Sequence, residues 1–442
     1  MNIHRVVAAN IADGTGKALY NGRITIADGH TAQIEKGDFL PGKGDIFVDD
    51  SKILAPAFID AHAHSDLSLL AMPEASGKTC QGIAYEISGN CGLSPFPLTE
   101  LNREHLQKLY QCYCIKLDWN TFAEYQARLH SANAELELFA QVGHNTLRAA
   151  VAGYEKKELS ATEKAQMLEL LDRELSAGAV GLSFGLLYTP GIFADFSEIT
   201  DLMRVVAKHN KICTVHLRSE STFLEESLQE MLSAARASGL KKLHISHLKT
   251  AGISNFHKVN SIINALNSKD LRVTGDIYCY DASMTQLSVI LPEPYDGYDD
   301  VKIMKLLQDK DSFAEVLKKV RLQRQQEYWQ NVRLISAAEP FTKYCNMLFC
   351  EAAEAAGITP EELFLQIVRN DAVNARAAFH TLSQKNMELL AAHDSVVPGS
   401  DESARNLTTQ FGISHPRGFG NHARYFLLRR QQGADIAQTV HE

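Results

Sequence analysis

The chain has 442 residues, of which 45% are hydrophobic and 22% are charged, and its formal net charge is −9. This composition is typical of a soluble globular enzyme, and the length is too great for one small domain. Because the chain has no basic excess to neutralise phosphates, we expect no nucleic-acid partner.

Membrane and secretory signals are not found in the sequence. No apolar run approaches the roughly 20 residues that a membrane-spanning helix needs. The start of the chain, MNIHRVVAANIADGTG, lacks the basic first segment and long apolar stretch of a signal peptide. The eight cysteines are irregularly spaced, which does not indicate a disulfide framework. We therefore expect a cytoplasmic protein without membrane contact.

Short strand-like segments open the chain and predict a small β domain over residues 1–55. They are residues 3–11, 22–34, 47–48 and 53–54, with Asp-Gly turns at 13–14 and 28–29.

From residue 56 onward, short apolar runs alternate with longer helical patterns. The predicted strands are 57–61, 83–87, 138–142, 179–183, 212–216, 243–247, 273–277 and 395–399. The predicted helices include 161–176, 196–209, 222–238 and 256–268. Alternating strands and helices without a GxGxxG motif favour a closed (β/α)8 barrel of the TIM type. We expect this barrel to occupy residues 56–442, with a helical insertion near 296–335 over its mouth.

Metal-binding residue types lie at the ends of several predicted strands. FIDAHAH ends the first with His62 and His64, which point to the same side because strand residues two apart share a face. EISGNCG contributes Cys91 between Gly89 and Gly92, which allow close backbone approach. Since the carboxyl ends of barrel strands converge on one face, we expect these side chains to meet there.

Three later strands end in the same way. ICTVHLRSE supplies His216, LHISHLK supplies His247, and VVPGSDE supplies Asp401. A carboxylate that ends a buried apolar strand is costly unless it is paired or lies near a metal. Zinc binds His nitrogen, Cys sulfur and carboxylate oxygen, so the combined pattern predicts a zinc site. We expect His244, earlier in its strand, to be structural.

The motifs and their order resemble the amidohydrolase superfamily, and within it the D-aminoacylases (N-acyl-D-amino-acid deacylases). The resemblance spans about residues 50–426 and rests on FIDAHAHSDLSLL, SGNCGLSPFPL, VGHNTLR, GAVGLSFGLLYTPG, ISHLKTAG, GSDE and HPR. Most members of the superfamily bridge two metals with a carbamylated lysine, whereas D-aminoacylases have a cysteine there, and GNCG matches that motif.

The resemblance implies a metal site in two parts. Cys91, His216 and His247 would hold one tight zinc ion, while His62 and His64 would form a second, weaker position beside Asp401. Zinc lowers the pKa of its bound water to about 7. A carboxylate within hydrogen-bonding reach then moves the proton to the leaving nitrogen, and Asp401 is the candidate general base and acid.

The resemblance also implies a small-molecule substrate, an N-acyl-D-amino acid. Lys249, Tyr278 and Arg417 match positions that bind the substrate carboxylate, and Tyr188 matches a residue of the pocket. Arginine can bind a carboxylate with two parallel hydrogen bonds, while lysine adds a point charge. The expected reaction is amide hydrolysis that yields a carboxylate and a free D-amino acid.

Three features depart from the family pattern. Glu402 follows Asp401 where a small residue is usual, and it could raise the pKa of Asp401 if it points inward. Met284 stands where a small hydroxyl residue is common, and a thioether there suggests a less polar substrate side chain. The sequence stops at Glu442 without a closing strand, so we expect either a truncated chain or a small β domain that is incomplete at the C-terminus.

Two other functions fit parts of the sequence. A cyclic amide hydrolase acting on hydantoins or dihydropyrimidines could use the same metal scaffold, although a ring amide offers no free carboxylate to Lys249 and Arg417. A binding protein that kept the barrel and lost catalysis is the second alternative. It would have no reason to retain all six metal-site and catalytic residues.

Overall fold

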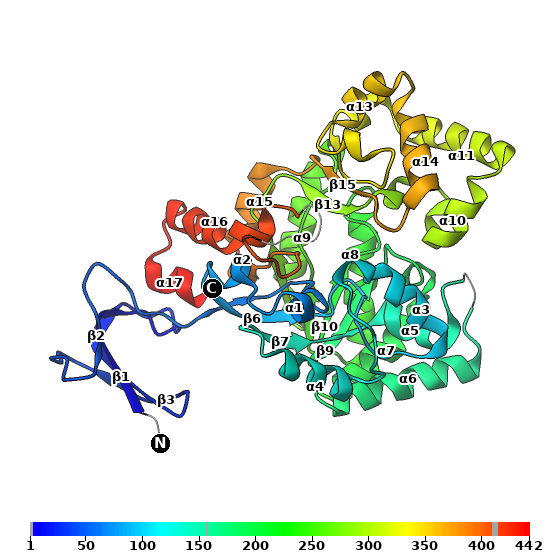
Figure 1. Ribbon diagram of the computed structural model, residues 1–442. Coiled ribbons are helices and arrows are strands. Elements are labelled where there is room, and N and C mark those ends of the chain that lie inside the picture. Colours follow the sequence, from blue (N-terminus) through cyan, green and yellow to red (C-terminus); the bar gives the residue numbers. More distant parts are fainter. Residues whose placement is uncertain (1–2, 156–157, 409–413) are drawn as a thin grey trace.

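In the computed structural model, residues 3–155, 158–408 and 414–442 are described. The chain begins with a four-stranded sheet of order β3-β2-β1-β4, set off from the rest of the molecule (Figure 1). Its strands are β1 (Ile3–Ile11), β2 (Tyr20–Ala27), β3 (His30–Lys36) and β4 (Ile46–Val48). The expected strand at 53–54 contributes a single bridge, between Leu54 and Ile11.

The next strands form the barrel, and each lies close to its predicted range. They are β5 (Phe58–Asp60), β6 (Ile83–Ser88), β7 (Glu137–Ala140), β8 (Val142–Gly143), β9 (Gly181–Gly185), β10 (Ile212–His216), β11 (Lys242–Ile245), β12 (Arg272–Ile277) and β16 (Val396–Pro398). All neighbouring pairs are parallel, in the orders β5-β6-β7 and β8-β9-β10-β11-β12-β16. Because β7 and β8 are separated by Gln141 alone, the described chain contains the eight strand positions of the predicted (β/α)8 barrel.

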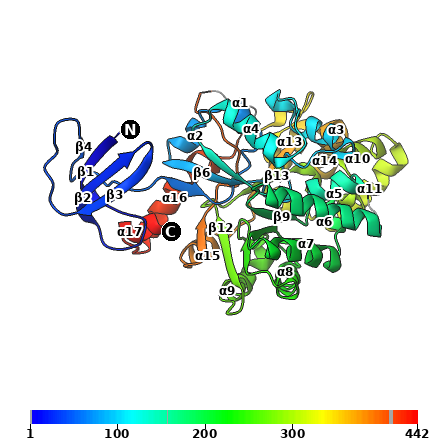
Figure 2. The same cartoon turned by 90° about the horizontal axis from the view of Figure 1, so that it is seen from below.

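Helices cover the outside of this barrel (Figure 2). They are α1 (Ser68–Ala71), α2 (Ser76–Thr79), α3 (Glu100–Leu109), α4 (Phe122–Ala132), α5 (His144–Ala152), α6 (Ala161–Ser176), α7 (Phe196–Lys208), α8 (Leu224–Ser238), α9 (Val259–Leu266), α15 (Gln384–Ala391), α16 (Arg417–Gln431) and α17 (Ile436–His441).

Helix α6 illustrates why the predicted boundaries hold. Ser160 accepts a hydrogen bond from the backbone of Glu163, whose side chain accepts one from the backbone of Ser160, forming a capping box. Met167, Leu171 and Leu175 then recur every four residues and are buried against the barrel.

The insertion is larger than predicted and is not purely helical. It contains the antiparallel sheet β13 (Ser283–Gln286), β15 (Arg376–Phe379) and β14 (Val332–Ser336). Its helices are α10 (Asp300–Leu306), α11 (Lys310–Gln323), α12 (Gln326–Trp329), α13 (Phe349–Ala356) and α14 (Pro360–Asp371). The expected helical segment over 296–335 contains α10, α11 and α12, and it differs from the prediction at its end, where β14 begins at Val332. The insertion has its own buried core around Trp329, Phe349 and Phe364.

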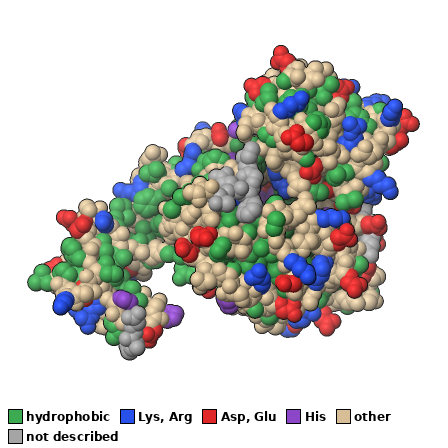
Figure 3. Space-filling model, in the orientation of Figure 1, with side chains coloured by type: hydrophobic (Ala, Val, Ile, Leu, Met, Phe, Trp, Pro, Cys, Tyr) green, Lys and Arg blue, Asp and Glu red, His purple; other side chains and the backbone are tan. Residues whose placement is uncertain are grey.

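The small sheet leaves many apolar side chains exposed, as Figure 3 shows on the left of the molecule. Ile3, Ile34, Leu40, Ile46 and Phe47 are among the exposed large hydrophobic residues. One link to the C-terminal end of the chain is the hydrogen bond between His441 Nδ1 and Gly14 O, at 2.7 Å.

Candidate metal centre and active site

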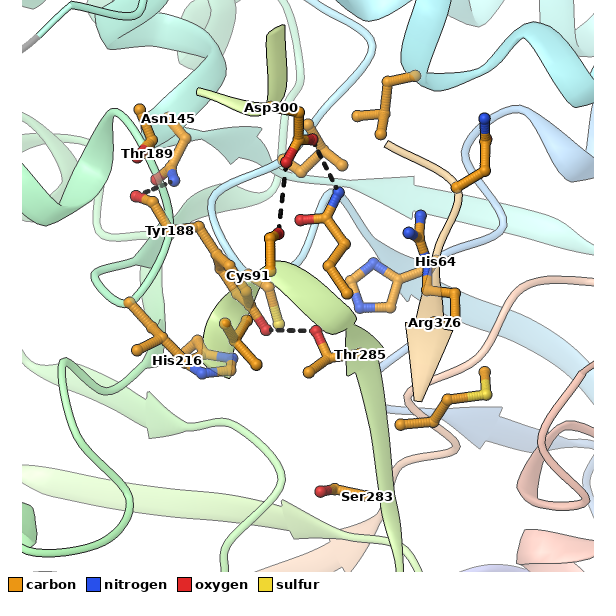
Figure 4. A pocket seen from close by; sticks show the side chains of 18 of the residues that line it. His64, Cys91, Asn145, Tyr188, Thr189, His216, Ser283, Thr285, Asp300 and Arg376 are labelled. Carbon is orange, nitrogen blue, oxygen red and sulfur yellow. Dashed lines mark hydrogen bonds between the residues drawn. The ribbon is translucent and has the colours of Figure 1, made fainter. Parts of the chain in front are cut away.

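A cavity of about 780 Å³ opens at the carboxyl ends of the barrel strands, beneath the insertion. Nearly all of the predicted site residues line it, and His62 alone of that set lies behind the wall, fully buried. Figure 4 shows His64, Cys91, Tyr188 and His216 around the cavity. The lining residues from the predicted set are His64, Cys91, Tyr188, His216, His247, Lys249, Tyr278, Met284, Asp401 and Arg417. The convergence expected from the barrel topology is therefore observed.

One potential metal-binding cluster combines His62, His64, Cys91 and Asp401, whose ligand atoms all lie within 4.8 Å of one another. His64 Nε2 is 3.1 Å from Asp401 Oδ1, and His62 Nε2 is 3.5 Å from the same oxygen. The cluster joins the first strand of the barrel, the second and the last.

A second cluster combines Cys91, His216 and His247, again with ligand atoms within 4.8 Å. Cys91 Sγ lies 3.4 Å from His247 Nε2 and 3.5 Å from His62 Nε2, so the thiol is shared by both clusters. Neither ring nitrogen of His216 has a hydrogen-bond partner in the described chain, although both are buried. The nearest carboxylate oxygen to His216 Nε2 that forms an ion pair is Glu220 Oε2, at 3.8 Å. A buried imidazole without a hydrogen bond fits a metal ligand, and sulfur with two nitrogens is a donor set that suits zinc.

Three of these potential ligands have positive φ angles, which residues other than glycine rarely adopt. The φ angles are +52° at Cys91, +37° at His247 and +51° at Asp401. Such conformations are costly and are concentrated at functional sites, where the surrounding structure enforces them. His247 lies beyond the end of β11, and this turn aims its ring at Cys91.

Glycine makes the Cys91 turn possible, as expected. Gly92 has a φ of +77°, and a Cβ there would lie 2.2 Å from the Asn145 side-chain oxygen. Gly185 at the end of β9 would clash even more severely, at 1.9 Å from the carbonyl oxygen of Cys91. The backbone that holds Cys91 therefore requires glycine both beside it, at Gly92, and at the end of β9, at Gly185.

Two carboxylates that the sequence analysis missed, the buried Asp276 and the half-buried Glu220, orient the histidines. Asp276 Oδ2 lies 3.0 Å from His62 Nδ1 and 2.9 Å from His244 Nε2. Glu220 Oε1 lies 2.9 Å from His247 Nδ1. A carboxylate on the far nitrogen of a ligating histidine fixes the tautomer and raises the basicity of the ligand. His244 lies outside both potential clusters and interacts with Asp276 instead.

The charges of the cluster stabilise one another. Although burial opposes ionisation of the thiol, the neighbouring His247 and His62 lower the pKa of Cys91 well below its usual value. Burial likewise opposes protonation of His64, yet its hydrogen bond to Asp401 raises the pKa of His64 to about 10. The site thus places a thiolate and a carboxylate among histidine rings, and a divalent cation would replace the histidine protons.

Glu402 does not act on Asp401 as the sequence suggested. Its Oε1 accepts a hydrogen bond from Ser403 N at 3.1 Å, and Oε2 accepts one from His415 N at 3.2 Å. The pKa of Asp401 is well below its usual value, because Arg417 and His247 outweigh the effect of burial. The second carboxylate is thus held by backbone amides, and Asp401 remains ionised.

Two cations and a phenol lie beside the metal-binding clusters. Arg417 Cζ is 4.6 Å from the ring centre of Tyr278, and Lys249 Nζ is 5.7 Å from it. Arg417 is the first residue of α16. The hydroxyl of Tyr278 and Nε of Arg417 are buried without a hydrogen-bond partner in the described residues. These groups provide donors for an anionic group in the cavity.

The remaining pocket residues come from β13 of the insertion and the loop after β9. Tyr188 stacks edge-on against His216, with ring centres 4.8 Å apart, and its hydroxyl is 3.2 Å from Thr285 Oγ1 (Figure 4). The carbonyl oxygen of Met284 accepts a hydrogen bond from Arg417 Nη2 at 3.4 Å. The insertion therefore contributes directly to the cavity wall beside the clusters.

Comparison with known proteins agrees with this geometry. The sequence profile described as the Amidohydrolase family matches residues 50–210. The N-acyl-D-glutamate deacylase of Alcaligenes xylosoxydans xylosoxydans is 33% identical over 299 residues, which cover 66% of this chain and 59% of that protein. The D-aminoacylase of the same organism is 32% identical over 238 residues, covering 53% of this chain and 49% of that protein.

Over residues 50–210 the chain is therefore similar to amidohydrolases. A solved N-acyl-D-glutamate deacylase from Bordetella bronchiseptica, in complex with zinc and a phosphonate inhibitor, is 25% identical with a TM-score of 0.77. The match covers 99% of this chain and 83% of that one. The fold is also that of a solved D-aminoacylase, with 24% identity and a TM-score of 0.77. The chain spans between 49% and 59% of the length of its curated deacylase relatives.

Among the described residues, no helix is both long enough and apolar enough to cross a membrane.

Proposed function

We propose that this chain is a metal-dependent amidohydrolase that cleaves the amide bond of N-acyl-D-amino acids, a carbon–nitrogen bond other than a peptide bond. The products are a carboxylate and a free D-amino acid. The observation that carries the proposal is a set of donors, Tyr278 OH and Arg417 Nε, that have no hydrogen-bond partner among the described residues and lie beside two potential metal clusters in one cavity. A carboxylate next to a scissile amide is the substrate that such an arrangement suits.

The metal would be held mainly by Cys91, His216 and His247. His62 and His64, with Asp401, would form a second and weaker position. The residue types fit zinc, because thiolate and imidazole are its preferred protein ligands. When bound, zinc supplies a water of lowered pKa and withdraws electron density from the scissile carbonyl.

Asp401 is the proposed proton carrier. Its Oδ2 is 2.8 Å from Arg417 Nη1, while Oδ1 faces His64 at 3.1 Å. The carboxylate is therefore fixed by Arg417 on one side and points toward the metal cluster on the other. From there Oδ1 takes a proton from the attacking water and delivers it to the leaving nitrogen.

The substrate carboxylate is proposed to bind between Lys249, Tyr278 and Arg417. Tyr278 donates its hydroxyl proton there, and burial raises the pKa of this phenol to about 12, which keeps it protonated. Lys249 Nζ is already 2.7 Å from Glu220 Oε1, so it contributes charge with part of its donor capacity in use. Tyr188 and Met284 would contact the rest of the substrate, and preference for the D-form is proposed from the deacylase relatives.

We also propose a division of the chain into two parts. Residues 1–55 would form the small β domain, and residues 56–442 would form the catalytic barrel with its insertion. The clusters and the cavity lie within the second part.

The test is hydrolysis of a panel of N-acetyl amino acids of both hands by zinc-loaded protein, with detection of the free amine. Release of D-amino acids, abolished in an Asp401→Asn control, is the expected result. Hydrolysis of hydantoin or dihydropyrimidine with no reaction of the linear amides would favour the cyclic-amide alternative. A protein that binds no zinc and cleaves neither class would contradict both.

A further inference from the structure

The barrel is closed irregularly between its first and last strands. β5 and β16 share no regular ladder, and each belongs to a different sheet. The junction instead consists of single bonds, such as Asp401 N to His62 O at 2.8 Å and His64 N to Glu402 O at 3.2 Å. These hydrogen bonds join the segments that carry His62, His64 and Asp401. The distance between the two segments therefore sets the distance between these three potential ligands.

A fully buried lysine lies at this junction. Lys78 belongs to the short helix α2, and its side chain is 0% exposed. Its Nζ donates to Asp60 Oδ2 at 2.7 Å, to Ser400 Oγ at 2.8 Å and to Glu402 O at 3.2 Å. A fourth contact is the ion pair with Glu86 Oε1 at 2.8 Å. One ammonium group therefore contacts β5, β6 and the segment after β16.

The partners of Lys78 connect directly to the cluster. Asp60 Oδ1 accepts hydrogen bonds from Ser400 N at 2.8 Å and from His62 N at 3.3 Å. Asp60 lies two residues before His62, and Ser400 lies immediately before Asp401. Asp60 and Ser400 thus transmit the position of the ammonium group to the backbone on both sides of the junction.

The ion network lies outside the cavity and has no role in the proposed reaction. Asp60, Lys78 and Glu86 are all 0% exposed, and none of them lines the cavity. Buried charges are expensive unless paired, and a well-packed apolar group is often as stabilising as a buried ion pair. Stability alone therefore does not explain why a lysine occupies this place, whereas fixing the geometry of the strand ends does.

We propose that Lys78 is a positioning residue for the cluster of His62, His64 and Asp401. It holds the ends of β5 and β16 in register, so that the two histidines and the carboxylate meet around one metal position. The residues of the other cluster, Cys91, His216 and His247, follow or end β6, β10 and β11. That cluster is linked to the junction of β5 and β16 only through Cys91, which both clusters share. The expected effect of Lys78 on kcat rests on the proposed function. The expected effect of Lys78 on zinc affinity does not.

The test compares Lys78→Met with the wild type by zinc titration and by steady-state kinetics. Groups that support metal ligands typically change metal affinity or activity by about 10- to 100-fold. We expect the weaker zinc equivalent to lose about that much affinity, while the tighter equivalent changes little. With N-acetyl-D-amino acids, kcat should fall about as much and KM should change little, because Asp401 acts in the transition state.

Lys211→Met is the matched control. Lys211 Nζ donates to the carbonyl oxygens of Leu175 and Ala179 at the opposite, amino ends of the strands, so it also joins neighbouring segments. Lys211→Met should lower the free energy of unfolding and leave the affinity for the weaker zinc equivalent unchanged. If Lys78 only stabilises the fold, Lys78→Met and Lys211→Met should have the same zinc affinities and the same kcat per folded molecule.

Ser400→Ala decides the matter if Lys78→Met does not fold. It removes one acceptor of the ammonium group and leaves all charges in place, so a smaller loss at the same zinc equivalent is expected. Unchanged zinc binding and unchanged kcat in a folded variant would overturn the proposal. If the variants bind zinc differently but the wild type hydrolyses no N-acyl amino acid, the positioning role of Lys78 would be supported and the proposed function contradicted.

Discussion

Arg417 Nη1 lies 2.8 Å from Asp401 Oδ2, and both side chains are nearly buried. The guanidinium group thereby pairs with the proposed proton carrier. Its Nε has no hydrogen-bond partner in the part of the chain that the structure describes, which leaves it available to a substrate. One arginine therefore touches the group that is proposed to move the proton and lines the cavity that would hold the substrate carboxylate.

Replacement of Arg417 by Met should separate these two contacts. Loss of a charge-assisted hydrogen-bonded pair costs roughly 1.5–3 kcal/mol, or about ten- to a hundredfold in kcat/KM. We expect a loss of this size with an N-acetyl-D-amino acid and a smaller one with an N-acyl amine that lacks the carboxylate. Arg376→Met is a suitable control, since Arg376 lines the same cavity and donates to Val373 O.

Equal losses with the two substrates would mean that Arg417 acts through Asp401 alone. In that case the substrate carboxylate is bound elsewhere in the cavity, and the cyclic-amide alternative becomes more attractive.

Asp401→Asn should retain the tighter zinc equivalent and lose turnover. An amide cannot accept the proton of the attacking water, so general base catalysis worth about 10²- to 10⁴-fold is lost. Glu402→Gln is the matched control, because Glu402 is the adjacent carboxylate and its oxygens are bonded to backbone amides. Turnover of Asp401→Asn at the wild-type rate would show that another group is the base.

Cys91→Ser should release the metal. Thiolate is a strong zinc ligand and a hydroxyl is a poor replacement, and Cys91 belongs to both clusters. We expect elemental analysis to find far less zinc in this variant, with circular dichroism unchanged. Cys112→Ser, at an exposed cysteine that lines the same cavity, should keep its full zinc content. A full complement in Cys91→Ser would remove Cys91 from the site.

The barrel and most of the proposed ligands could be predicted because each ligand ends an apolar strand. His216 is the last residue of β10, in a strand whose preceding residues are almost entirely buried, so the polar residue stands out in the sequence. In the sequence, His62 and Asp401 also follow short apolar runs. Parallel strands in a barrel then bring these ends together, whatever the distance along the chain.

The supporting groups gave no such signal. Asp276 lies inside β12 and Glu220 in the loop after β10, and in the sequence each resembles an ordinary acidic residue. Lys78 is in a helix of four residues, where a lysine is normally exposed. The strand β13 was missed because all four of its residues are half-buried and show no alternation.

The pH dependence of stability offers a test at His415, away from the proposed metal ligands. Burial, followed by the nearby Arg417 guanidinium, lowers the pKa of His415 to about 3. The ring is neutral in the folded protein, and its Nδ1 accepts a hydrogen bond from Arg417 N at 3.1 Å. In the unfolded chain the ring titrates near its ordinary pKa of about 6.5.

A lowered pKa means that the unfolded state binds the proton first as the pH falls. The contribution of His415 is therefore fully present above pH about 6.5 and is lost progressively from there toward pH about 3. At pH 5 the loss amounts to about 2 kcal/mol, at 1.36 kcal/mol per pKa unit.

We expect wild-type protein to lose this much more unfolding free energy between pH 7.5 and pH 5 than His415→Gln, which has no proton to gain. Urea denaturation of both proteins in the presence of a chelator measures the difference without a contribution from metal binding, which is itself pH-dependent. A constant difference in unfolding free energy at the two pH values would mean that His415 is protonated in the folded protein, and that the hydrogen bond from Arg417 N does not hold its ring neutral.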